Sequence, residues 1–470
     1  MNNLSNSNNR KFDESNETVQ RFELLSKEKH AFFFDIGDFE VVIDHYINLF
    51  NYKKANSVID LALRLHPWSI DIQIKKALTL IYNEKPKEAI ILLLQLEKRE
   101  PYNEDIIATL CFAYVDDKKP TTAFEKIKEF LLINNQNHED FLKECISIFE
   151  NYEYYEFCLQ LVKIARQENY NNSDFIFDLG YFYEKIENFQ QSILYYNQFL
   201  DIFPYSEDTW YNLGILYSKM RDYDKAIDCY NFAIAINEDY FQAYFNLANA
   251  YANISDYENA LEAYKNFEKY DAPNKQTYFH IGDCYEKLED YPNAILYYKK
   301  ALHVNPDFAE AWYGLGMTYY AQEKFFESLY FTQKAISLDN EEADYWFALG
   351  NIYSRIMYFG KAEFAYENAV ELNHSDIEAW TNYAFISYMN EDYEKAIEIL
   401  DRAIALNNNA SQLYYKKAAY QFLCNKLEMS LETLKNALDL NCFNISSFSE
   451  TCPQAFENEN FAKILKDYSL

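Results

Sequence analysis

The stretch that decides the fold is DYPNAILYYKKAL, residues 290–302, because close variants of it recur along the chain. DYDKAIDCYNFAI occupies residues 222–234, DYENALEAYKNF residues 256–267 and DYEKAIEILDRAI residues 392–404. The starts of these stretches differ by 34 residues or by a multiple of 34. Self-similarity at a fixed period of about 20 to 50 residues is the signature of a repeat architecture.

A period of 34 residues divides most of the chain into twelve repeats. One extra residue precedes the fourth repeat, and no other repeat is displaced. The repeats start at Ile36, Ile70, Glu104, Glu139, Ser173, Glu207, Phe241, Lys275, Ala309, Ala343, Ile377 and Ser411. Positions within a repeat are numbered 1 to 34 below.

Side chains of one kind recur at fixed positions of this register. Position 4 holds four of the five tryptophans, and position 8 holds five of the eight glycines. Position 20 is small in every repeat: Ala55, Ala89, Ala123, Cys158, Ser192, Ala226, Ala260, Ala294, Ser328, Ala362, Ala396 and Ser430. Spacings of three and four place positions 4, 7, 8 and 11 on one face of a first helix, and positions 20, 24 and 27 on one face of a second. Small residues at positions 8 and 20 predict a close crossing of the two helices.

The helix boundaries carry their own signals. Position 16 is often Asp or Asn, which can cap the second helix. Pro86 and Pro120, at position 17, suit the first turn of that helix. Proline at position 32 ends the second helix before the next repeat, at Pro67, Pro101, Pro204 and Pro306.

This pattern of Trp, Leu, Gly, Tyr and Ala at fixed offsets, closed by Pro, resembles the tetratricopeptide repeat. The resemblance covers roughly residues 36–442, is strongest from Ser173 to Asn408, and is weakest in the fourth repeat, where Cys145 and Ile146 replace the Leu–Gly pair. It implies an all-α fold, an α-solenoid in which antiparallel helix pairs stack into a right-handed superhelix with a concave groove.

The remaining segments are short. Residues 1–18 are rich in Asn and Ser and predict a disordered tail. Residues 19–35 are expected to form a capping helix over the first repeat. Residues 443–470 are expected to cap the last repeat, with Phe461, Ile464, Leu465 and Tyr468 on one helical face.

The bulk composition narrows the function. The formal net charge is −31, and so strong an excess of carboxylates disfavours nucleic acid and anionic membranes as partners. The first residues contain no apolar stretch suited to a signal sequence, and no run approaches the length of a membrane span. Eight scattered cysteines without metal-ligand spacing indicate reduced thiols, so we expect a cytoplasmic protein.

The sequence offers no catalytic, metal or cofactor site. The seven histidines lack partners at metal-binding spacing, and the glycines occur at packing positions rather than in a phosphate-binding loop. The segments outside the repeats are too short for a catalytic domain. We therefore expect a protein that is not an enzyme and needs no cofactor.

Positions 2, 5, 9, 12 and 13 point away from the packed face of the first helix, and in tetratricopeptide repeats this far face lines the groove. Position 5 is aromatic in six consecutive repeats; Thr381 interrupts the row, and Tyr415 resumes it. Asn249 and Asn351, at position 9, match part of the clamp with which chaperone-binding members hold a carboxylate. Aromatic residues stand where that clamp needs a lysine, so the clamp is incomplete. The candidate protein-binding residues are Phe177, Tyr211, Phe245, Asn249, Phe279, Tyr313, Phe347, Asn351 and Tyr415.

The sequence thus predicts a scaffold or adaptor that binds a protein or peptide segment in its groove, the segment being basic with apolar anchors. The position-5 aromatics have a second interpretation, in which they only pack between repeats. A regulatory subunit of an enzyme complex fits the sequence equally well. An RNA-binding helical repeat protein fits less well, because that class favours 35-residue repeats and a basic groove.

Overall fold

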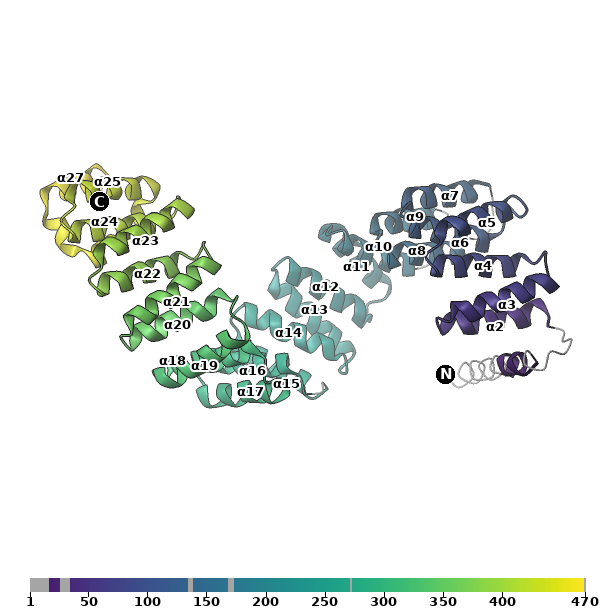
Figure 1. Cartoon of the computed structure of the whole chain (residues 1–470), viewed down its shortest axis with the longest axis horizontal. Coiled ribbons are helices and arrows are strands. Elements are labelled where there is room, and N and C mark those ends of the chain that lie inside the picture. The colour runs from purple at the N-terminus through teal and green to yellow at the C-terminus, as the bar shows by residue number, and fades with distance from the viewer. Residues whose placement is uncertain (1–16, 26–33, 134–137, 168–172, 271–272, 469–470) are drawn as a thin grey trace. The chain divides into compact units, whose positions relative to one another are not determined.

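The computed structural model describes residues 17–25, 34–133, 138–167, 173–270 and 273–468 (Figure 1). Every regular element within these ranges is a helix. The predicted class, an all-α solenoid of stacked helix pairs, is confirmed. The predicted tail, residues 1–18, lies outside the described residues except for its last two.

Twelve helix pairs follow one another, and each pair coincides with one repeat of the sequence. The pairs are α2 (Ile36–Asn48) and α3 (Tyr52–Leu65), α4 (Ile70–Tyr82) and α5 (Pro86–Glu97), α6 (Glu104–Asp116) and α7 (Pro120–Ile133), α8 (Glu139–Asn151) and α9 (Tyr155–Gln167), α10 (Asp174–Lys185) and α11 (Phe189–Ile202), α12 (Glu207–Lys219) and α13 (Tyr223–Ile236), α14 (Phe241–Asn253) and α15 (Tyr257–Glu268), α16 (Lys275–Lys287) and α17 (Tyr291–Val304), α18 (Ala309–Ala321) and α19 (Phe325–Leu338), α20 (Ala343–Arg355) and α21 (Phe359–Leu372), α22 (Ile377–Met389) and α23 (Tyr393–Leu406), and α24 (Ser411–Leu423) and α25 (Leu427–Leu440). The fourth repeat forms a pair despite its weak sequence pattern.

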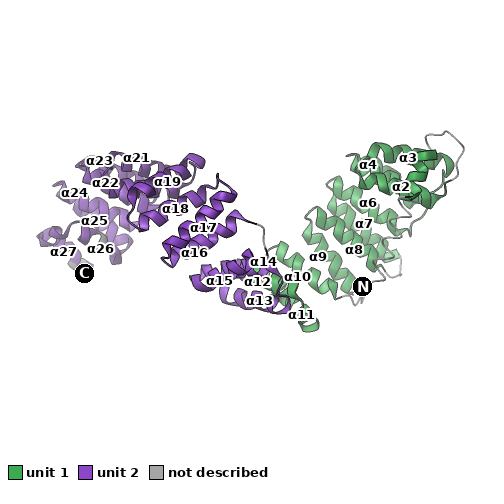
Figure 2. Cartoon of the chain, turned by 90° about the horizontal axis from the view of Figure 1, so that it is seen from below, with its two compact units in different colours: residues 1–216 green, residues 217–470 purple. Residues whose placement is uncertain are grey.

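The chain divides into two compact units, residues 1–216 and residues 217–470 (Figure 2). Each unit has its own buried apolar clusters. The largest cluster of the first unit runs from Ile107 to Phe182, and that of the second from Leu349 to Tyr420.

Position 20 is buried in every helix pair, as a close crossing of the two helices requires. All twelve position-20 residues have no exposed surface. Two of the three serines at this position hydrogen-bond to the backbone of the first helix: Ser192 Oγ donates to the Gly180 carbonyl at 2.6 Å, and Ser430 Oγ donates to the Ala418 carbonyl at 2.7 Å. A Cβ atom added at Gly180 would lie 2.6 Å from the Tyr196 ring. Small residues at positions 8 and 20 therefore let the backbones approach.

The turn between the paired helices has the same geometry in every repeat. Position 15 adopts a left-handed conformation, with φ between 54° and 62°, although no glycine occupies it. The amide of position 16 donates to the carbonyl of position 11, as Asp290 does to Tyr285 at 2.8 Å. The side chain of position 16 then caps the second helix where it is Asp or Asn, as predicted; the Asp290 side chain accepts from the Asn293 amide. This is the Schellman end of one helix joined directly to the capped start of the next.

The tryptophans of position 4 join consecutive repeats. Each indole Nε1 donates to the carbonyl of position 32 in the preceding repeat. The bonds are Trp210 to Pro204 at 3.0 Å, Trp312 to Pro306 at 2.8 Å, Trp346 to Asn340 at 2.9 Å and Trp380 to His374 at 3.0 Å. The indole N–H of each tryptophan is thereby hydrogen-bonded to the preceding repeat, while the rest of the ring packs as an apolar side chain.

Helical segments cover both ends of the repeats. Residues 17–25 are helical and bury Val19 and Phe22 against the first repeat, whereas residues 26–33 of the expected N-terminal cap lie outside the described residues. At the other end, η1 (Cys442–Ile445), α26 (Ser446–Thr451), η2 (Pro453–Glu457) and α27 (Glu459–Asp467) follow α25. Phe461, Ile464 and Leu465 are buried there beside Leu434 and Ala437 of the last repeat.

Overpacking position 20 should destabilise the protein. We expect Ala260→Leu or Ala294→Leu to lower the free energy of unfolding by roughly 1–3 kcal/mol, because the added methylenes force neighbours off their rotamers. Glu262→Leu, on the exposed side of the same helix as Ala260, should be nearly neutral. Urea melts followed by circular dichroism measure both, and equal losses would contradict the close crossing.

Glycine at position 15 should stabilise the turn. Glu289 is exposed and has φ of 59°, a conformation that disfavours any residue with a Cβ atom. We expect Glu289→Gly to raise the free energy of unfolding by roughly 0.5–1 kcal/mol, the relief of strain exceeding the entropy gained by the unfolded chain. Glu262→Gly, in the middle of α15, is the control and should lower it by about 1 kcal/mol.

Candidate functional site

The predicted groove residues are mostly half-buried rather than open. Phe177, Tyr211, Phe245, Phe279, Tyr313 and Phe347 all keep part of their surface exposed. Tyr415 differs: it is completely buried, and its hydroxyl donates to the Asn441 carbonyl at 2.9 Å. The expectation that Tyr415 resumes the exposed row is therefore wrong, because the C-terminal segment covers this ring.

Within the second unit, Phe245 and Phe279 are linked by His280, at position 6. The His280 ring lies 5.8 Å from the Phe245 ring and 5.5 Å from the Phe279 ring, and it stacks on Tyr264 at 5.4 Å. Burial lowers the pKa of His280, which favours the neutral imidazole. Phe245 and Phe279 thus pack against His280 and remain partly exposed.

The same arrangement recurs in the later repeats. Tyr313 contacts Tyr345 of the next repeat at 4.8 Å, and Phe347 contacts Tyr366 at 6.0 Å. Burial and the neighbouring Asp344 raise the pKa of Tyr313 to about 12, so its hydroxyl stays protonated. Tyr313 thus packs against the next repeat and Phe347 against the second helix of its own repeat, and both rings remain partly exposed.

The two predicted asparagines hold buried tyrosines in place. Asn249 accepts a hydrogen bond from the Tyr264 hydroxyl, and Asn351 accepts one from the Tyr366 hydroxyl at 2.7 Å. Both tyrosines are at position 24 and are buried. Each asparagine is itself only partly exposed.

Two carboxylates beside Phe279 were not singled out from the sequence. Asp283 and Glu286 occupy positions 9 and 12, and burial raises the pKa of both. Glu286 accepts hydrogen bonds from Thr318 at 3.0 Å and Tyr298 at 3.1 Å. The sequence register already predicts that positions 9 and 12 face the groove, so these two carboxylates could have been found from it. Their desolvation could not, because it depends on how the neighbouring helices pack.

The predicted groove face of the first unit is acidic and less aromatic. Glu40, Asp71, Asp105 and Glu144 line a hollow of about 280 Å³, together with Lys75, which pairs with Asp44 at 2.6 Å. Burial raises the pKa of Glu40 and of Glu144, and nearby carboxylates raise both further. In the fifth repeat, burial and the charges of Asp174 and Glu150 raise the pKa of Asp178 to about 6. These carboxylates are held where a cation would stabilise them.

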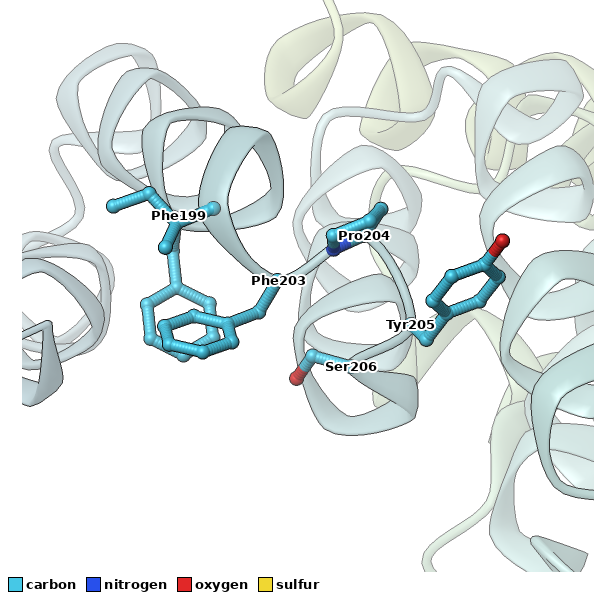
Figure 3. Close-up of a pocket in the computed structure, with 6 residues that line it drawn as sticks. Phe199, Phe203, Pro204, Tyr205 and Ser206 are labelled. Atoms are coloured by element: carbon cyan, nitrogen blue, oxygen red, sulfur yellow. The ribbon is translucent and has the colours of Figure 1, made fainter.

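An apolar hollow adjoins the predicted residue Phe177. It has a volume of about 440 Å³ and is lined by Phe199, Ile202, Phe203, Pro204, Tyr205 and Ser206 (Figure 3). The Phe199 and Phe203 rings are 5.0 Å apart, and Phe177 lies 5.4 Å from Phe199. Tyr205 points away from these rings and is 82% exposed, so one side of the hollow is aromatic and the side at Tyr205 is open to solvent (Figure 3).

Sequence models described as tetratricopeptide repeat match seven segments, which together make up half of the chain. The matched segments are residues 173–205, 207–240, 241–274, 276–308, 309–342, 343–376 and 377–409. The chain belongs to the tetratricopeptide repeat family. Among curated proteins, none matches it significantly. The family assignment agrees with the helix pairs, each of which repeats the same crossing, turn and cap.

Solved structures with the same kind of fold are distant in sequence. A tetratricopeptide repeat protein from Parabacteroides merdae shares 16% identity and a TM-score of 0.44 over 57% of this chain and 98% of its own. A chain of the APC/C hetero-tetramer Cut9–Hcn1 shares 16% identity with this chain, with a TM-score of 0.39. The match covers 85% of this chain and 89% of that chain. YrrB, described as a TPR protein with an unusual peptide-binding site, shares 20% identity with this chain, with a TM-score of 0.33. The match covers 39% of this chain and 95% of YrrB.

No helix formed by the described residues is both long and apolar enough to cross a membrane. Proteins built of these repeats are in general non-catalytic scaffolds that bind proteins or peptides.

The ionisation of Asp178 should cost stability at neutral pH. Its pKa is raised, so the folded chain holds this proton up to a higher pH than the unfolded chain, and stability falls as pH rises from about 4 to about 6. We expect Asp178→Asn to raise the free energy of unfolding by about 1 kcal/mol at pH 7, after allowance for partial exposure, and to leave it unchanged at pH 4. Urea melts at both pH values measure this. An equal gain at both would show that ionisation is not the cause.

Proposed function

We propose that this protein is a scaffold that binds by recognition alone, and that its groove face takes a basic segment of a partner protein carrying apolar anchors. Membership of the tetratricopeptide repeat family supports protein binding. The observation that carries the finer proposal is the juxtaposition of half-exposed rings with desolvated carboxylates around Phe279.

The chemistry of the ligand follows from both features. The exposed parts of the Phe245, Phe279 and Tyr313 rings favour apolar side chains of a ligand. Asp283 and Glu286 would be stabilised by a Lys or Arg side chain, which would lower their raised pKa values. The net charge of −31 would accelerate encounter with a basic segment.

A cytoplasmic location fits this proposal. All eight cysteines are free thiols, and most are buried, as expected of a protein in a reducing compartment. A regulatory subunit of an enzyme complex would use the same surface, because regulation of that kind is also binding. RNA binding is disfavoured, since the groove face presents carboxylates where phosphates need cations.

The test uses the full chain and a labelled 12-residue peptide that alternates Lys or Arg with Leu or Phe, measured by fluorescence anisotropy. Phe245→Ala, Phe279→Ala and Tyr313→Ala should each weaken binding by roughly 1–2 kcal/mol, about five- to thirty-fold. Glu262→Ala, on the exposed side of the second helix in the same repeat as Phe245, is the control and should change affinity less than twofold.

Thermal melts of the same variants separate the two interpretations of the rings. Variants with an unchanged thermal melt and weaker peptide binding would support binding of the peptide at these rings. Melts that collapse would assign the rings to packing between repeats, and intact melts with unchanged affinity would place the peptide elsewhere. A version of the peptide with Glu in place of Lys and Arg should not bind, and equal binding would contradict the charge argument.

A further inference from the structure

The C-terminal segment packs on both helices of the last repeat. The helix α27 contacts the second helix α25, and its residues Phe461, Ile464 and Leu465 are buried there. The helix α26 contacts the first helix α24 instead. Covering the end of the stack accounts for α27. The position of α26 needs a second explanation, because α26 lies on the helix whose far face is predicted to line the groove.

The burial of α24 shows that the segment reaches this predicted groove face. At position 9, the residue is at least partly exposed in the other eleven repeats and is buried only at Ala419. At position 5, Tyr415 is completely buried, whereas the residues of the seven preceding repeats are partly exposed. In those repeats another helix pair follows and leaves both positions open. The C-terminal segment therefore covers more of α24 than a following repeat would.

Polar contacts hold the start of the segment on α24. The Tyr415 hydroxyl donates to the Asn441 carbonyl at 2.9 Å, and the Asn444 side-chain amide donates to the Ser411 hydroxyl at 3.0 Å. Ser411 and Tyr415 are four residues apart and share one face of α24. Residues 441–444 are thus bound along that face.

Two side chains of α26 continue this contact. Phe448 is fully buried in the same apolar cluster as Tyr415 and Ala419. The Thr451 hydroxyl accepts a hydrogen bond from Lys416 Nζ at 2.9 Å. Phe448 and Thr451 are three residues apart, so they share one face of α26. The pattern bound by α24 is therefore an aromatic ring followed, three residues later, by an acceptor for Lys416.

Lys416 lacks the partner that its charge requires. Burial lowers the pKa of its ammonium group, and the charge of Glu450 offsets this effect only in part. Within the described part of the chain, Lys416 forms no ion pair, and its hydrogen bond is to the neutral Thr451 hydroxyl. A carboxylate in the place of that hydroxyl would compensate the buried charge. A segment with such a carboxylate would suit this surface better than the one that occupies it.

We propose that this side of α24 is a binding surface for a helical segment of a partner protein that carries Phe and, three residues later, Asp or Glu. Residues 446–457 occupy the surface until such a partner displaces them. A tethered segment competes at an effective concentration on the order of 1 mM, so a partner needs stronger contacts, which the carboxylate supplies. Because the surface belongs to the predicted groove face, the proposal rests on the function proposed above, although its ligand is acidic where the ligand at Phe279 is basic.

Hydrogen–deuterium exchange of the full chain, followed by mass spectrometry, shows whether the segment opens on its own. Amides of residues 446–457 should exchange at least tenfold faster than those of α24 and α25, since a displaceable segment opens without the repeat beneath it. Thr451→Glu should slow exchange of the segment at least threefold, because it supplies the missing carboxylate, and in a Lys416→Met chain it should not. Exchange as slow as that of α24 and α25, or no slowing by Thr451→Glu, would overturn the proposal and leave the segment as a structural cap.

The binding test uses the full chain and a fluorescein-labelled peptide of residues 441–457, with both cysteines replaced by serine and with Thr451→Glu. Affinity is measured by anisotropy at 0.15 M salt. The Phe448→Ser chain, whose own segment is held more weakly, should bind the peptide at least tenfold more tightly than the parent chain. The Thr451→Glu chain should bind it at least threefold more weakly than the parent chain. Adding Lys416→Met to Phe448→Ser should remove most of the gain.

A matched control and a second variant keep the test decisive. Lys435→Met, on the exposed side of α25, should change neither exchange nor affinity by more than twofold. If α24 and α25 also exchange faster in the Phe448→Ser chain, the Thr451→Glu chain decides the binding test. Equal affinity of the parent, Phe448→Ser and Thr451→Glu chains would overturn the proposal. Failure of the basic peptide to bind at Phe279 would leave these results unchanged, because that peptide tests rings in other repeats.

Discussion

The close crossing of paired helices at positions 8 and 20 is the constraint on which the rest of the structure depends. Small side chains there let two helix backbones touch, to the point that the Ser192 hydroxyl reaches the Gly180 carbonyl. Large rings are then displaced to positions 4, 5, 11 and 24, where they fill the spaces around the crossing. Tyr196, Tyr230, Tyr264, Tyr298 and Tyr366 are the largest of these buried groups at position 24.

Repetition of this crossing leaves two kinds of exposed face. The first helices present the edges of position-5 rings and the partly buried Asp283 and Glu286, whereas the second helices present positions 18 and 22. Most second helices carry polar side chains there, as a solvated surface requires. The first helices depart from this rule where they bury carboxylates, at Asp283 and Glu286. This departure is local, because each repeat contacts only its neighbours and can vary without disturbing the others.

The groove-face rings show why packing and binding are not exclusive interpretations. Phe279 contacts His280, Tyr298 and Phe308, so part of its surface stabilises the stack. The rest of the ring is exposed and is held rigid by those same contacts. A ring held in this way loses little freedom when a ligand binds, which is the property of a good anchor.

The sequence by itself determined the repeat length, the register, the helix boundaries and the identity of the crossing residues, because each of these follows from periodicity and from local propensity. It also predicts that Phe245, Phe279, Tyr313 and Phe347 face a groove, and the structure shows that all four are partly exposed. Only the tertiary structure decided that Tyr415 is covered, since that depends on where the C-terminal segment packs. The raised pKa values of Asp178 and Asp283 likewise depend on burial by surrounding helices. Burial and desolvation are sums over all surrounding atoms, and a pattern within one repeat does not contain them.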